Sequence, residues 1–197
     1  MNLNIGTKDP VNKILWDEYD AKRAQGGFSL AADTPSSSAS GWILKGLPMA
    51  VNYTTRVAEI VKTAVVIAGS TTTVTRVAKG SLFIVGDIVA NVLSGNAVAI
   101  TGIDTTNADY DALTHLTNGG AFVADTVLFE AAAVSTGGAA YLFAANALLS
   151  DNTKIAGTAT VTAVISAQEI QELNLPAPIP TAVKTALNLN GKYFQFV

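Results

Sequence analysis

The stretch RVAKGSLFIVGDIV contains the residue types of a phosphate-binding loop, so the spacing of those residues decides whether it can do that chemistry. Such a loop has four residues between its glycines, followed by Lys and then Ser or Thr, so that backbone N–H groups and one ammonium surround the phosphate. Here five residues separate Gly80 from Gly86, and Lys79 precedes both glycines. Asp87 stands where a cation is needed. The pattern therefore favours a strand, Leu82–Val85, between two turn glycines with positive φ.

A second candidate for chemistry is the acidic stretch DTTNADYDALTHL, in which four oxygen-bearing side chains lie close together. They are Asp104, Asn107, Asp109 and Asp111. A calcium loop of the EF-hand type also needs a central Gly and a distant Glu, and both are missing here. The stretch therefore predicts a short helix capped by Asn107 or Asp104, with a cation site as the alternative.

Other residues suited to catalysis are sparse. His115 is the single histidine, and one histidine cannot form a zinc site of three or four protein ligands. No serine lies in a Gly-x-Ser-x-Gly elbow, and the absence of cysteine excludes thiolate nucleophiles, thiolate metal sites and disulfides. We therefore predict that the protein is not an enzyme and that it has neither a cofactor nor a metal.

Composition narrows the class of protein further. The chain has 197 residues, 49% of them hydrophobic and 14% charged, with a net charge of −3. A nucleic-acid binder would show a basic face, so this charge argues against one. No run approaches the roughly 20 apolar residues of a membrane span, and the first residues lack the order of a secretion signal. We expect synthesis in a host cytoplasm and no partner membrane.

Residues 9–25 predict an amphipathic helix that Pro10 begins and Gly26 ends. Its candidate partner-binding residues are Val11, Ile14, Leu15, Trp16 and Tyr19. The Ser-rich stretch AADTPSSSASG then predicts a linker, so we divide the chain into an N-terminal segment, 1–40, and a body, 41–197. The apolar stripe of the helix either packs on its own body or docks on a partner.

The body is predicted to be mainly β, a compact β-sandwich or barrel-like structure with a few short helices. STTTVTRV, DTVLFEAAAV and GTATVTAVIS are rich in the residue types that suit pleated surfaces. NVLSGNAVAITGI carries Ser-Gly-Asn between two apolar runs, which indicates a hairpin. Short strands with a turn every 8–12 residues are typical of these two architectures.

The end of the chain predicts an extended LPAPIP turn, a two-turn helix TAVKTAL capped by Thr181, and a strand KYFQFV. Phe194 and Phe196 lie on one face of that strand, because side chains alternate along it. A loose aromatic strand is an aggregation hazard, so it should pair within the domain or across a subunit interface. The candidate oligomer-interface residues are Tyr193, Phe194 and Phe196.

Three stretches together resemble the head fibre or head decoration proteins of tailed bacteriophages. They are GWILKGLPMAV…TRVAEIVKTA, VAKGSLFIVGDIV…AVAITGIDTTNADYDALT, and the terminal Pro turn, helix and aromatic strand, and they span residues 41–197. The resemblance implies a β-rich homotrimer bound to the major capsid protein on the capsid exterior of a virion. Because no heptad pattern for a coiled-coil shaft is present, a compact knob is favoured over a long fibre.

Two other classes are weighed against this virion structural protein. A phage or cell-surface adhesin with a glycan-binding face would expose aromatic residues, yet Trp16 and Trp42 both stand in helix-like or core-like contexts. An enzyme would need a cluster of acid, base or nucleophile, and none emerges from the sequence.

Overall fold

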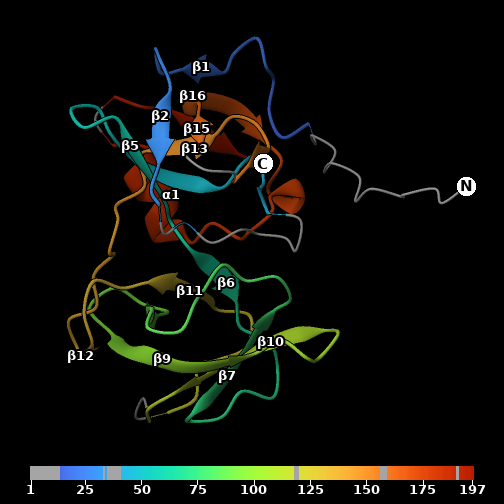
Figure 1. The fold of residues 1–197 in the computed structure, drawn as a ribbon, viewed down its shortest axis with the longest axis vertical. Coiled ribbons are helices and arrows are strands. Elements are labelled where there is room, and N and C mark those ends of the chain that lie inside the picture. Colours follow the sequence, from blue (N-terminus) through green and yellow to red (C-terminus); the bar gives the residue numbers. More distant parts are fainter. Residues whose placement is uncertain (1–13, 33, 35–40, 118–119, 156–158, 190) are drawn as a thin grey trace, which may run out of the picture.

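The computed structural model describes residues 14–32, 34, 41–117, 120–155, 159–189 and 191–197. These residues form two large curled sheets, which lie one above the other in Figure 1. Strands make up 40% of the structure and helices 6%, and the curled sheets form a half-barrel. The predicted mainly β class is therefore confirmed.

The first sheet is built from both ends of the chain. Its strands, in order, are β1 (Lys22–Arg23), β16 (Ala163–Ile170), β13 (Ala147–Leu149), β4 (Pro48–Asn52), β5 (Val57–Ile60), β2 (Phe28–Leu30) and β15 (Thr160–Val161), and β17 (Phe194–Phe196) pairs with β16. Thr162 alone separates β15 from β16 along the chain, yet these strands lie near opposite ends of the sheet. The sheet therefore curls back toward itself.

The second sheet is formed by the middle of the chain, inserted between β5 and β13. Its strands, in order, are β6 (Thr63–Val65), β11 (Val127–Glu130), β8 (Ile88–Ala90), β9 (Asn96–Asp104), β10 (Tyr110–His115) and β7 (Val74–Ala78), and β12 (Ser135–Thr136) pairs with β9. A bridge between Val66 and Val77 brings the two end strands of this sheet together. A separate small ladder joins β3 (Trp42–Ile43) to β14 (Thr153–Lys154).

Both faces of β13, in the middle of the first sheet, are buried. Neighbouring residues of β13 show this, because Leu149 joins the cluster inside the curl with Phe28 and Met49, while Leu148 joins the cluster on the other face. Alternating side chains of one strand point to opposite faces, so a strand with two buried faces is apolar throughout. The outer cluster is covered by α1 (Thr181–Leu187), β17 and the segment that contains Trp16.

The predicted N-terminal helix is wrong where the structure describes it. Residues 14–25 hold a turn and then β1, while residues 9–13, with Val11, lie outside the described residues. The backbone of this segment bonds to the first sheet instead of to itself, for instance through Ala24 N–H to the Ala163 carbonyl at 2.8 Å. A helical stripe would also bury Ile14 and Tyr19, yet both are exposed.

The described part of the N-terminal segment belongs to the body that we predicted to begin at residue 41. β2 pairs in parallel with β5 and antiparallel with β15, and Phe28 is fully buried in the core. Removal of the whole segment, residues 1–40, would therefore delete two strands of the first sheet. Of the two alternatives for the apolar residues, packing on the chain's own body holds for Leu15 and Trp16.

Two local predictions in the middle of the chain are also wrong. Residues 104–116 hold the end of β9, a turn and β10 rather than a helix, because β10 pairs with β9 on one side and β7 on the other. Leu82–Val85 is not a strand: Leu82 packs into the first-sheet core and its neighbour Phe83 into the second, so this segment runs between two cores. The flanking turn glycines are confirmed, with φ of 82° at Gly80 and 101° at Gly86.

Several short-range predictions are confirmed. The Ser-Gly-Asn hairpin is the antiparallel β8–β9 pair, TAVKTAL is α1, and the end of the chain is β17. Thr181, predicted to cap α1, is instead its first residue, and Pro180 occupies the cap position without a side-chain bond. A short 3-10 helix, η1 (Glu172–Asn174), precedes the Pro turn.

The burial of Trp16 gives a first testable prediction. Trp16→Ala should lower the free energy of unfolding by about 3–5 kcal/mol, because it leaves a large cavity in the outer cluster. Tyr19→Ala should change it by less than about 0.5 kcal/mol, since that side chain is 99% exposed. Denaturant unfolding of both variants measures this, and equal stabilities would contradict the placement of Trp16.

Candidate functional site

The Lys-Gly-Ser loop at residues 79–81 does surround an anion, and that anion belongs to the chain itself. The N–H groups of Gly80 and Ser81 donate to Asp111 Oδ2 at 2.9 and 3.1 Å. Lys79 Nζ lies 2.9 Å from Asp111 Oδ1. Asp111 is buried, so these contacts offset the loss of its hydration. The loop is thus a structural link between β7 and β10.

The other acidic residues of this stretch form turns between β9 and β10. Asp104 Oδ1 accepts hydrogen bonds from the N–H and hydroxyl of Thr106, at 2.9 and 2.7 Å. Asn107 Oδ1 accepts the Asp109 N–H at 2.9 Å. The Thr106 backbone bond first, and its hydroxyl second, hold the pKa of Asp104 below its usual value. Among the described residues, no group of three or more His, Cys, Asp or Glu gathers where a metal ion could bind.

The ring of His115 is likewise held by contacts within the chain. Its Nδ1 lies 2.7 Å from the Leu116 carbonyl oxygen, and its Nε2 lies 2.8 Å from Thr75 Oγ1. Because a carbonyl can only accept, Nδ1 donates. Both ring nitrogens are therefore engaged within the chain, and the ring packs edge-on against Phe122.

The candidate partner-binding residues are divided by the structure. Leu15 and Trp16 are buried, whereas Ile14 and Tyr19 are exposed. Ile14 and Tyr19 line a groove of about 440 Å³ together with Glu169 and Gln171. The Gln171 N–H donates to the Leu15 carbonyl at 2.8 Å, so the end of β16 holds this segment in place.

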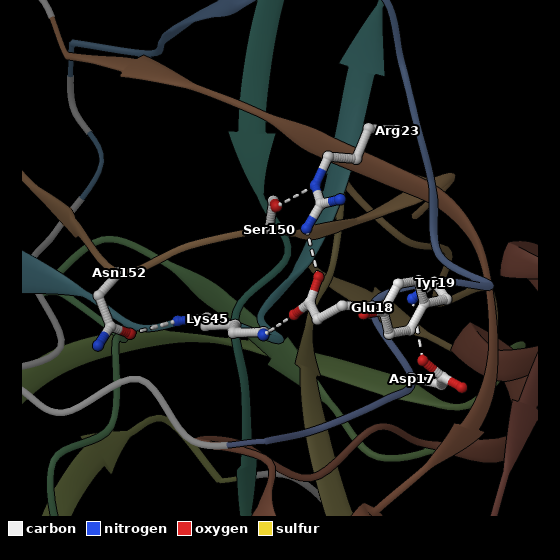
Figure 2. Close-up of polar contacts among 7 residues, drawn as sticks. All are labelled: Asp17, Glu18, Tyr19, Arg23, Lys45, Ser150 and Asn152. Atoms are coloured by element: carbon white, nitrogen blue, oxygen red, sulfur yellow. Dashed lines mark hydrogen bonds and ion pairs between the residues drawn. The ribbon is translucent and has the colours of Figure 1, made fainter.

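A polar cluster fastens the same segment to the first sheet. Figure 2 shows the Glu18 carboxylate between the Arg23 guanidinium and the Lys45 ammonium, with which it forms ion pairs. Arg23 Nε also donates to Ser150 Oγ at 2.9 Å. Lys45 lies 4.6 Å from the centre of the Trp16 ring, in the geometry of a cation–π contact. The cluster thus couples the position of Trp16 to β13.

The ionisation of Glu18 reflects these contacts. Partial burial opposes the charged form, but the hydrogen bonds and charges of Lys45 and Arg23 outweigh it and hold the pKa of Glu18 below its usual value. A carboxyl whose pKa is lowered on folding contributes stability above its unfolded pKa. That contribution is lost as the pH falls through the folded value.

The candidate oligomer-interface residues differ in their exposure to solvent. Phe194 is buried in the outer cluster of its own chain, Phe196 is half-buried beneath Lys184, and Tyr193 is exposed. The outer edge of β17 is occupied by a side chain, since the Phe194 N–H donates to Asn188 Oδ1 at 2.6 Å and Asn188 Nδ2 donates to the Phe194 carbonyl at 3.1 Å. The end strand is therefore paired and protected within the chain at Phe194, which is the first of the two alternatives that the sequence left open.

The partner-binding and oligomer-interface candidates, which the sequence analysis placed at separate sites, belong to segments that both join β16. The C-terminal half of β16 pairs with β17, and the residue after it, Gln171, binds the N-terminal segment. We call the exposed apolar side chains of the segments joined to this end of β16 the β16 rim. Its members are Ile14, Tyr19, Leu173, Tyr193 and Val197. Leu173, at the start of this C-terminal region, has no predicted role from sequence, because an exposed leucine after a strand carries no local signal.

Sequence reasoning also missed a buried charge cluster at the junction of the two sheets. It consists of Lys62, Asp87 and Glu130. The available signal was Lys62 within the apolar run AEIVKTAVVIA, since a lysine in a buried strand needs carboxylate partners. Its partners come from two distant segments, which a single sequence does not bring together.

The chain is without counterparts in the comparisons with known proteins. No family model, no curated protein and no solved structure matches it. In the part of the chain that the structure describes, no helix is both long enough and apolar enough to cross a membrane.

The Glu18 cluster makes a pH-dependent prediction. Glu18→Gln should lower the free energy of unfolding at neutral pH by about 0.5–1 kcal/mol, the range of partly exposed ion pairs. The difference from the parent chain should shrink as the pH falls below about 4, because Glu18 itself is then protonated. Unfolding curves across this range measure it, with the exposed Asp20→Asn as control. A deficit that stays constant with pH would contradict this role of Glu18.

The Asn188 contacts predict how the end strand is kept soluble. Asn188→Ala should destabilise the chain by roughly 1–3 kcal/mol, because two backbone groups of Phe194 lose their partner. It should also promote aggregation through the freed edge. Denaturant unfolding measures the stability and light scattering during heating measures the aggregation, and the exposed neighbour Gln195→Ala should behave like the parent chain in both. Unchanged aggregation of the Asn188 variant would show that this edge is protected by other means.

Proposed function

We propose that this protein is a structural protein of a tailed-phage virion, a head fibre or decoration protein that binds the major capsid protein on the capsid exterior. The resemblance of the sequence supports the class, and the mainly β fold is consistent with it. The observation that carries the proposal is the β16 rim. Its exposed apolar side chains belong to segments that bond to the end of one strand, and exposed apolar surface is a common feature of sites where proteins associate.

The internal role of the Lys79–Ser81 loop adds support. The loop and Asp111 belong to one of the three stretches that carry the resemblance, and they bind each other directly. The contact between the loop and Asp111 joins the two ends of that stretch, and this gives a structural reason for the order of its residues. Other buried charged groups also form ion pairs within the chain, namely those of Asp111, Lys62 and Lys45. Their use in internal contacts favours a structural or binding role for the protein.

We propose that the protein acts as a homotrimer and that the β16 rim contributes to its contacts with the capsid or between subunits. The exposed Tyr19 and Leu173 are suitable contact residues, because neither contributes to the buried clusters of its own chain. Burial of apolar surface contributes about 25 cal/mol per Å², so a few such side chains affect affinity measurably.

The test is co-sedimentation with capsids assembled without this protein, together with light scattering of the free protein. The parent chain should bind the capsids and have the mass of a trimer. The double variant Tyr19→Ser and Leu173→Ser should bind at least about tenfold more weakly, which corresponds to 1.4 kcal/mol. The matched control is Val85→Ser, an equally conservative loss of an exposed apolar side chain on the segment before β8.

Each outcome bears on a different part of the proposal. Failure of the parent chain to bind capsids would contradict the virion role, and binding to a glycan array instead would favour the adhesin class. Capsid binding that is unaffected in the double variant would contradict the use of the β16 rim. A stable monomer at micromolar concentration would contradict the trimer.

A further inference from the structure

The buried charge cluster lies where the chain passes from the first sheet to the second. Lys62 stands between β5 and β6, so it belongs to the covalent link between the sheets. Its ammonium lies 2.8 Å from both carboxylate oxygens of Asp87 and 3.1 Å from Glu130 Oε1. The Glu130 N–H donates to the Lys62 carbonyl at 3.2 Å, so backbone and side chains both tie these strands at the junction.

A small cavity of about 100 Å³ adjoins the cluster. The charged side chains that line it are Glu59 from β5, Lys62, Asp87 from the turn before β8, and Glu130 from β11. The remaining lining side chains are uncharged. They are Thr34, Ile60, Ile84, Leu142 and Phe143, which include the segment by which the chain returns toward the first sheet.

The cluster has an imbalance of charge. Both carboxylate oxygens of Asp87 contact the Lys62 ammonium, and Asp87 Oδ2 also accepts the Ile84 N–H at 2.8 Å. Glu130, in contrast, has one oxygen, Oε2, without a hydrogen-bond partner among the described residues. With both carboxylates ionised, one ammonium faces two buried negative charges. Burial of an uncompensated charge is costly, and a single proton on Glu130 would remove it.

We propose that the junction between the two sheets is a proton-controlled latch. With Glu130 protonated, the cluster is neutral, Glu130 and Asp87 share a hydrogen bond, and the link at Lys62 is held closed. With Glu130 ionised, the two carboxylates repel each other and compete for Lys62. The strands at the junction then open more readily, while each sheet keeps its own core.

The titration of Glu130 supports this direction. Burial, and next the charge of Asp87, outweigh the opposing effect of Lys62 and raise the pKa of Glu130 to about 7. A carboxyl whose pKa is raised on folding contributes stability below its unfolded pKa, near 4.5. That contribution is lost as the pH rises through about 7. The sign is opposite to that of Glu18, so the two groups can be told apart by experiment.

The experiment is hydrogen exchange of the full chain from about pH 5 to about pH 8, with rates corrected for the intrinsic pH dependence of exchange. Peptides covering residues 60–66 and 126–131 should lose protection by up to about tenfold per pH unit, levelling off above about pH 7. Peptides from β9 and β10, in the interior of the second sheet, should show no such change. Equal pH dependence in all these peptides, or none at the junction, would overturn the latch.

Two variants identify the group that titrates. Glu130→Gln mimics the protonated form, so the junction should stay protected throughout this range. Asp87→Asn removes the repelling charge and leaves Lys62 to Glu130 alone, so the pH dependence between about pH 5 and about pH 7 should become weaker. Asp109→Asn, an exposed carboxylate elsewhere on the second sheet, should retain the behaviour of the parent chain. A Glu130→Gln variant that keeps the parent's pH dependence would overturn the proposal, and the parent chain's own profile tests it even if a variant fails to fold.

Discussion

β16 buries most of its apolar residues and is bonded along both edges over its first half, and the first sheet is arranged around it. It pairs with β1 and β13 over one half and with β17 over the other. The residue that follows it binds the backbone of the N-terminal segment. A strand in this position must find its partners from both ends of the chain. That constraint explains why Trp16 and Phe194, which are far apart in the sequence, share one buried cluster.

Among the contacts that hold the second sheet to the first, three differ in kind. One is the adjacent pair Leu82 and Phe83, whose side chains enter different cores. Another is the Thr63 hydroxyl, which donates to the Pro178 carbonyl at 2.7 Å. The third is the Lys62 cluster. Apolar packing is insensitive to pH, whereas the charge cluster responds to it. Some contacts at the junction therefore keep their strength as the pH changes, and the Lys62 cluster does not.

Charged residues are few in this chain, and several of them serve its own architecture. Asp111 fills the Lys-Gly-Ser loop, Glu18 holds the N-terminal segment, and Lys62 joins the sheets. In each case a buried or half-buried ion finds a partner from a distant segment, so the pairs specify which segments meet. The exposed apolar residues of the β16 rim remain outside this internal pairing, which is consistent with the contact role proposed for them.

The sequence by itself determined the features whose causes are local. The mainly β class followed from β-branched composition, the β8–β9 hairpin from Ser-Gly-Asn between apolar runs, α1 from its short periodic run after the Pro turn, and the turns at Gly80 and Gly86 from residue type. Each depends on neighbours within a few residues, which a pattern along the chain can report.

Tertiary structure alone decided the rest. Residues 104–116 have acceptable helix signals, but β9 and β7 offer bonds on both sides, and those contacts outweigh a weak local preference. The N-terminal residues likewise exchange helical bonds for the edge of β16. The β16 rim and the Lys62 cluster are invisible along the chain, because their members come from separate segments. Their proximity exists only after the two sheets have formed, since long-range pairing and burial, rather than spacing, bring them together.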